Sequence, residues 1–87
     1  MLSLKDCIDL SDLSDDEIAA IAEHEHVPEI IAAEIGCQLI QTTAGCVVLR
    51  HYIHDNLVSA QARHLDQKAQ ALALLLRRFE NEHPAHP

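Results

Sequence analysis

The sequence predicts an all-α protein, in which two to three short helices pack on a long C-terminal helix that is either straight or bent. The chain has 87 residues, which suits one small domain. It is 48% hydrophobic but only 2% aromatic, so Leu, Ile, Val and Ala must form the core. Its two Gly and three Pro leave little turn-forming sequence for a β-sandwich or barrel. We therefore expect a single helical domain over residues 1–82 and a polar tail over residues 83–87.

The first short helices are predicted by their start signals. Residues 4–9 suit a short helical turn. The next start is clearer, because Ser14 and Glu17 have the spacing of a capping box, in which the serine caps free amides and the glutamate reaches back. Leu13 and Ile18 stand where a hydrophobic staple would hold that cap. The helix should end near residues 24–26.

A second helix is predicted from about Pro28 to Gln41, because proline favours the first position of a helix and disfavours its interior. Gly36 lies inside this helix and suggests a close approach to a neighbour. Residues 42–45 are the expected break. Two adjacent apolar rows make this helix a central one: Ile31, Ile35 and Leu39 form one row, and Ile30, Ala33, Cys37 and Ile40 form the other.

The C-terminal half predicts a long helix, since residues 46–83 contain neither Gly nor Pro. One continuous helix of that length would extend about 57 Å. Its two apolar stripes are out of phase, so the helix either shows different faces to two partners or bends near residues 59–64. The first stripe is Leu49, Ile53, Leu57 and Ala60, and the second is Leu65, Ala69, Leu72, Leu76 and Phe79.

The second stripe predicts self-association. So short a chain has little sequence to cover so long a helix, and a second copy packed on Leu65, Ala69, Leu72, Leu76 and Phe79 is the simplest cover. The expected function is that of a non-enzymatic helical module that forms homo-oligomers. The sequence has no motif for a phosphate-binding loop or for a catalytic nucleophile, so we expect neither an enzyme nor a bound cofactor.

Charge narrows the classes of partner. The net charge of −8 argues against nucleic acid, which needs a basic surface. The first 36 residues carry ten acidic residues and one lysine, so a basic protein is a second candidate partner. The longest aliphatic run, residues 71–76, is too short to cross a membrane.

Cysteine usage and the first residues predict a location. Cys7, Cys37 and Cys46 are odd in number and lack CxxC or zinc-finger spacing. Residues 1–6 lack the pattern of a signal peptide. We expect reduced, mostly buried thiols in a cytoplasmic protein.

Metal binding is the alternative function, since seven histidines are present. Glu23 and His26 form a Glu-x-x-His pair, which helical di-metal sites use twice together with two further glutamates. Glu34 could supply one of these, and a symmetric dimer would double the set. His51 and His54 add two imidazoles, one of which Asp55 could orient. The predicted divalent-metal ligands are Glu23, His26, Glu34, His51 and His54.

A third hypothesis is an interface whose association depends on pH through the histidines.

Residues 10–29 carry a resemblance. The run AIAEHEHVPE at residues 20–29, with the Ala-rich stretch to Gly36 after it, resembles the opening of small all-helical bacterial proteins without an assigned activity. The resemblance covers between a third and a half of the chain. It implies a helical fold and a bacterial, cytoplasmic origin, and it transfers no functional residue.

Overall fold

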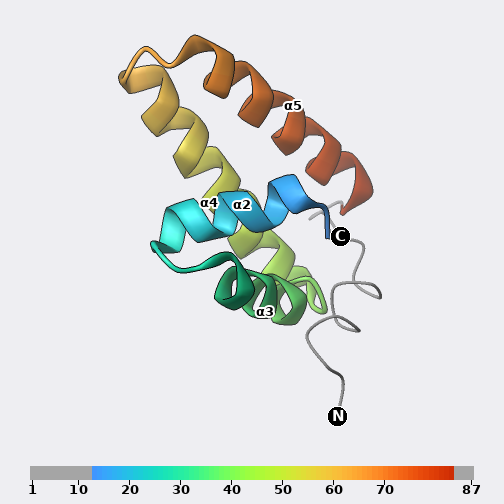
Figure 1. Cartoon of the computed structure of the whole chain (residues 1–87). Helices are drawn as coiled ribbons and strands as arrows, with labels where there is room; N and C mark the ends of the chain where they lie inside the picture. Colours follow the sequence, from blue (N-terminus) through green and yellow to red (C-terminus); the bar gives the residue numbers. More distant parts are fainter. Residues whose placement is uncertain (1–12, 84–87) are drawn as a thin grey trace.

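The computed structural model describes residues 13–83, which form four α-helices and no strand (Figure 1). The all-α prediction is therefore confirmed. Helix α4 lies at the centre and packs against the three others. The turn expected at residues 4–9 and the tail residues 84–87 lie outside the described residues. The helices are α2 (Asp15–Glu25), α3 (Glu29–Leu39), α4 (Thr43–Ala62) and α5 (Asp66–Glu82).

Helix α2 begins and ends as the sequence indicates. The predicted capping box is present: the Glu17 amide donates to Ser14 Oγ at 3.2 Å, and the Ser14 amide donates to Glu17 Oε1 at 2.8 Å. Leu13 and Ile18 are both buried beside this cap. The helix ends at Glu25, and the φ of its C-cap, His26, is 56°, in the left-handed region. Pro28 is the N-cap of α3, so this helix begins at Glu29, one residue later than the sequence predicts.

The break between α3 and α4 is shorter than predicted. Helix α4 starts at Thr43, so three of the four residues expected in the break are helical. Thr42 is the N-cap, and its Oγ1 accepts from the Gly45 amide at 2.9 Å. The tight connection brings Gly45 against the end of α3, where an added Cβ would lie 1.8 Å from the Leu39 carbonyl oxygen.

The C-terminal half is two antiparallel helices rather than one long helix. The chain leaves α4 at Arg63, turns through His64 at φ 60°, and runs back along α4 as α5 (Figure 1). The Leu65 amide donates to the Ala60 carbonyl at 2.9 Å, and the His64 amide donates to that of Gln61 at 3.1 Å. These two bonds form a Schellman motif, which ends a helix. The bend expected near residues 59–64 is thus a complete reversal.

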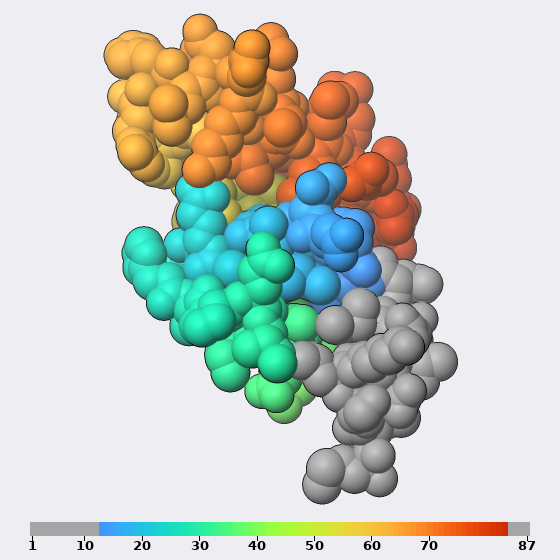
Figure 2. Space-filling model, in the orientation of Figure 1, coloured from blue at the N-terminus to red at the C-terminus, as the bar shows by residue number. Residues whose placement is uncertain are grey.

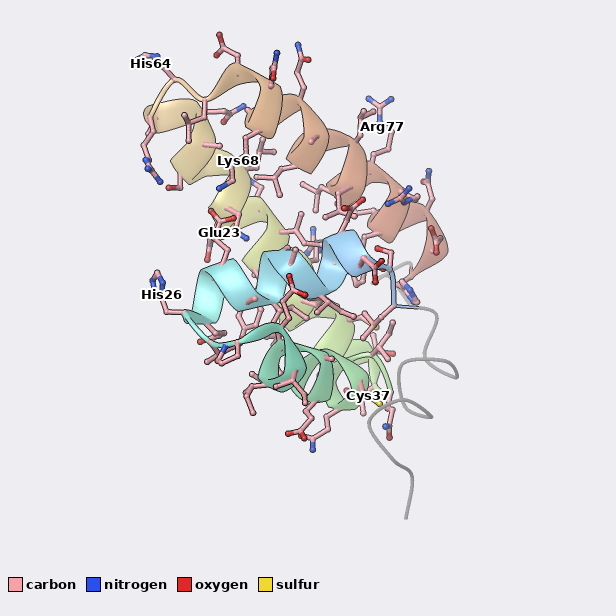
Figure 3. All side chains as sticks on the ribbon, viewed as in Figure 1. Glu23, His26, Cys37, His64, Lys68 and Arg77 are labelled. Carbon is pink, nitrogen blue, oxygen red and sulfur yellow. The ribbon has the colours of Figure 1, made fainter. Side chains whose placement is uncertain are left out.

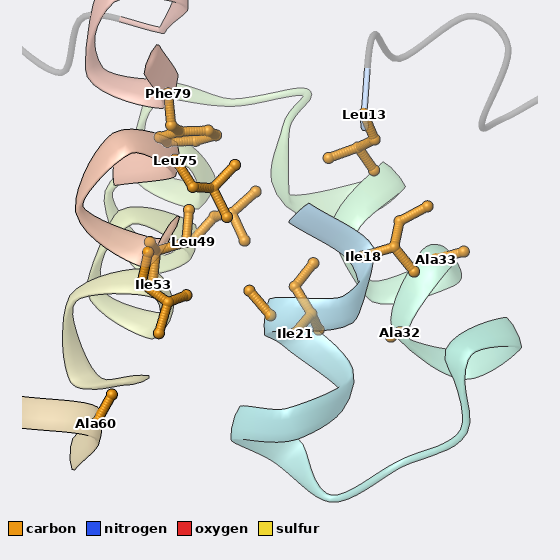
Figure 4. Packing of buried hydrophobic residues seen from close by; sticks show 12 residues of the cluster. Leu13, Ile18, Ile21, Ala32, Ala33, Leu49, Ile53, Ala60, Leu75 and Phe79 are labelled. Carbon is orange, nitrogen blue, oxygen red and sulfur yellow. The ribbon is translucent and has the colours of Figure 1, made fainter. Parts of the chain in front are cut away.

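All four helices contribute to one buried cluster (Figure 4). The first apolar stripe of the C-terminal half faces the core, because Leu49 and Ile53 are buried, and Ile18 and Ile21 of α2 are buried as well. Among the polar side chains, buried Asn56 links two helices by donating from Nδ2 to the Ala20 carbonyl at 2.8 Å. The buried apolar residues are Leu13, Ile18, Ala20, Ile21, Ala32, Ala33, Cys37, Leu49, Ile53, Ala60, Leu72, Leu75 and Phe79.

The cysteines depart in part from the prediction of reduced thiols. Cys46 is a free, half-buried thiol, and burial raises its pKa. Cys37 is buried and disulfide-bonded, so the prediction is wrong for this residue. Cys7 lies outside the described residues. Along residues 13–83, no helix is both long and apolar enough to cross a membrane.

Candidate interaction groove

An apolar groove runs between α2 and α5, over a floor that α4 supports (Figure 2). Helices α2 and α5 both pack on α4 and have few contacts with each other, which leaves a hollow of about 220 Å³ between them. The small side chains of Ala19, Ala20 and Ala71 keep it open, and Leu72 and Leu75 form its apolar base. The groove is therefore large enough and apolar enough to hold an apolar side chain.

Ion pairs connect the two rims of this groove. Lys68 on α5 binds Glu23 on α2, with Nζ and Oε1 2.5 Å apart (Figure 3). Further along, Arg78 Nη2 lies 3.8 Å from Asp16 Oδ2. Both pairs are exposed, so each stabilises the fold by about 1 kcal/mol at most. Their main consequence is that the groove has charged groups of both signs at its edges.

Leu74 stands beside the groove and is the most exposed large apolar residue of the described chain, with 68% of its surface accessible. It follows Ala71 by three positions, which rotates it about 60° around the helix, away from the core. No acidic residue lies among its exposed neighbours on the outer side of α5. Those neighbours are Gln67, Gln70, Arg77, Arg78 and Asn81.

The predicted interface stripe on α5 mostly faces the core of the same subunit. Leu72 and Phe79 are buried, and Ala69 and Leu76 are half-buried against α4. Leu65 alone among the five is exposed, at 37%, in the turn before α5. Leu75, which the predicted stripe omits, is buried as well. The stripe is therefore covered without a second copy, and an interface on α5 would have to use its other side.

The predicted metal ligands are spread over the subunit. Glu23 is paired with Lys68, and His26 stands exposed at the end of α2 (Figure 3). Glu34 lies on the exposed side of α3. Among residues 13–83, no group of three or more His, Cys, Asp or Glu side chains is placed to hold a metal ion. A site completed by a second subunit stays a prediction.

Two of these ligands do share a second, smaller hollow between α4 and α5. His51 and His54 line it together with Arg50, Leu76 and Glu80, and its volume is about 140 Å³. Arg50 Nη1 lies 3.5 Å from Glu80 Oε2. The arginine and the carboxylate therefore largely neutralise each other there.

A side-chain cluster that the sequence did not predict joins α2 to α4. The ring of His24 stacks on that of Tyr52, with centroids 4.2 Å apart. His24 Nε2 lies 2.9 Å from Asp55 Oδ2, so Asp55 pairs with His24 and not with His51. Glu25 lies on the other side, 3.6 Å from His24 Nδ1. The Glu-His-Glu-His segment at residues 23–26 indicated a site in this region. The histidine that contacts Tyr52 and Asp55 is His24, however, and not His26.

Tyr52 should report this cluster in an alkaline titration. Hydrogen bonding to Glu25 raises the pKa of Tyr52 above its ordinary value of 10.0, and burial and the charge of Glu25 add to the effect. The folded state thus holds the phenol proton more tightly. The resulting contribution to the free energy of unfolding is complete below pH 10 and is lost as the pH rises through the folded-state pKa.

The chain has one tyrosine, so ultraviolet absorbance of tyrosinate follows this group alone. We expect the midpoint to lie higher in native protein than in protein unfolded in urea. Glu25→Gln, which removes the negative charge, should lower the native midpoint. Equal midpoints in native and unfolded protein would contradict this assignment.

Comparison of the chain with family models, with curated proteins and with solved structures found no match. The resemblance seen in residues 10–29 therefore stays a prediction.

Proposed function

We propose that this protein is a non-enzymatic helical module that self-associates through helix packing. The observation that carries the proposal is the apolar groove between α2 and α5, with the exposed side chain of Leu74 at its edge. Exposed apolar surface next to a groove, rimmed by polar residues, is typical of protein–protein interaction sites. Leu74 lies on the side of α5 opposite to the stripe that the sequence indicates, whereas the groove is lined by one residue of that stripe, Leu72.

The charge distribution supports a protein partner over nucleic acid. Helix α2 exposes Asp15, Asp16 and Glu23, while the outer side of α5 exposes Arg77 and Arg78. A second copy offers both signs of charge and is the partner proposed first. A basic protein that covers the acidic side of α2 is the other candidate, and binding to nucleic acid is not expected at a net charge of −8.

A cytoplasmic location is part of the proposal and rests on the sequence alone. The disulfide at Cys37 weighs against it, because disulfides are rare in reducing compartments. Thiol alkylation in freshly lysed cells tests this point. Labelling of Cys37 without a reductant supports a reducing location, and labelling only after reduction opposes it.

Native mass spectrometry of untagged protein tests the proposal, because it reports the subunit count and bound metal together. We expect at least two subunits per particle at micromolar concentration, with no bound metal. A mass of 9.7 kDa at every concentration would reject self-association.

The alternative function is a carboxylate and histidine metal site completed by dimerisation. It is favoured by one observation, the shared hollow that His51 and His54 line with Glu80. Expression in metal-supplemented medium followed by elemental analysis tests it. At least one iron, zinc or manganese ion per dimer would support it, and substoichiometric amounts of all three would reject it.

A further inference from the structure

The α2–α5 groove is large enough to hold a leucine side chain such as that of Leu74. A cavity of roughly 150 Å³ can hold a benzene molecule, so a hollow of about 220 Å³ has room for the smaller side chain of a leucine. Leu74 cannot fill the groove of its own subunit, because it points away from the core on the outer side of α5. The groove that Leu74 can enter is therefore that of another copy.

The relative position of Leu74 and the groove suits a two-fold symmetric pair. Leu74 lies next to Ala71 and Leu75, which line the groove, so each copy carries the inserting side chain and the receiving surface side by side. In an isologous dimer the same patch of both subunits meets itself. Two copies can then each insert one leucine into the other, and neither surface is left open for a third copy.

The charges agree with the same arrangement. Arg77 and Arg78 flank Leu74 along α5. Arg78 already lies 3.8 Å from Asp16 of its own subunit, whereas Figure 3 shows Arg77 directed away from α2 of its own subunit. The receiving groove is bordered on α2 by Asp16 and Glu23. Lys68 of the same subunit already pairs with Glu23, so insertion of Leu74 adds Arg77 of one copy to a rim where the other copy has carboxylates, and complementary charges favour that register.

We propose that this chain forms a two-fold symmetric dimer in which Leu74 of each copy occupies the α2–α5 groove of the other. This proposal rests on the proposed function and specifies its partner and its interface. A dimer in which both leucines are inserted should be more stable than a dimer with one inserted leucine. Of the apolar stripe of α5, Leu72 lines the groove, and the interface does not use the other four residues.

Two substitutions that act on opposite sides of the contact test it. Leu74→Ala removes the inserted side chain, and Ala19→Trp fills the groove from the exposed side of α2. Because two contacts are lost in each homodimer, each variant alone should weaken dimerisation by about 100-fold or more in sedimentation equilibrium. Ile30→Ala is the matched control, because Ile30 is 60% exposed but lies on α3, away from the groove, and its dissociation constant should not change.

Mixing the two variants gives the sharpest result. Leu74 of the Ala19→Trp chain can enter the open groove of the Leu74→Ala chain, and the shortened side chain at position 74 of the Leu74→Ala chain faces the filled groove without a clash. With one of two contacts restored, the heterodimer should bind within about tenfold of the wild-type dimer. Circular dichroism establishes that both variants fold as the wild type does.

The outcomes separate this inference from the proposed function. Recovery of association in the mixture supports the inserted-leucine dimer. If wild-type protein dimerises and the folded variants dimerise equally well, self-association stands and this interface is wrong. If the wild type is a monomer throughout, both proposals are wrong. A variant that fails to fold is replaced by Leu74→Gln or Ala19→Leu, and the same mixing criterion applies.

Discussion

Replacing Gly45 by alanine should destabilise the fold by about 3 kcal/mol or more, the upper end of the cost of overpacking. The new Cβ would lie 1.8 Å from the Leu39 carbonyl oxygen and 2.6 Å from its carbonyl carbon. These are backbone atoms at the end of α3, so they can give way only if the connection between α3 and α4 moves. Such a shift would also strain the bond from the Gly45 amide to Thr42 Oγ1.

Gly36→Ala is the matched control for this effect. Its Cβ would meet the tips of two side chains, at 2.8 Å from Ile21 Cδ1 and 2.9 Å from Leu13 Cδ1. Side-chain tips can rotate, and alanine is better than glycine inside a helix by about 1 kcal/mol. We expect a much smaller loss in urea denaturation than for Gly45→Ala. Equal losses for both variants would mean that the backbone contact at Gly45 is not what requires a glycine.

Phe79→Ala should destabilise the protein by about 3–5 kcal/mol, as other substitutions of buried aromatic residues do. Phe79 is 1% exposed, and it lies next to Leu75 and Leu49 where α5 packs on α4 (Figure 4). The loss is a large part of the total for a small domain, which is about 5–15 kcal/mol. Urea denaturation followed by circular dichroism should therefore show a clear fall in the midpoint.

Leu74→Ala is the control on the same helix. With Leu74 68% exposed, its truncation should change the free energy of unfolding by no more than about 0.5 kcal/mol. The comparison has to be made at a concentration where the protein is monomeric, because dimerisation adds to apparent stability. A loss at Leu74 as large as that at Phe79 would contradict the assignment of inner and outer sides to α5.

Local signals in the sequence predicted much of the fold. The capping box at Ser14 and the interruption at Pro28 depend on neighbouring residues, and both appear where expected. The reversal at His64 was missed because a left-handed position usually carries glycine, and here a histidine adopts it. The absence of Gly and Pro from residues 46–83 therefore predicted continuity where the chain turns.

The candidate site was harder to predict than the helices. The groove depends on how α2 and α5 sit side by side on α4, and no local spacing encodes that arrangement. The aliphatic run of residues 71–76 contained the relevant residues, but periodicity alone assigned Leu76 to the inner side and overlooked Leu75. Leu74 does not belong to the predicted stripe, and its exposure beside the groove is visible only in the structure. The pairing of His24 with Asp55 likewise joins residues that are far apart in the sequence.

The groove and the buried core both require that α5 folds back on α4 within one subunit. A distance between spin labels at exposed positions His51 and Asn81, introduced through noncanonical residues, tests it most directly by pulsed electron paramagnetic resonance. Doubly labelled protein is diluted into unlabelled protein so that only distances within one chain are measured. We expect a short distance, because the neighbouring side chains of Arg50 and Glu80 lie 3.5 Å apart. A continuous helix would separate the two positions by about 45 Å, and that result would contradict the account.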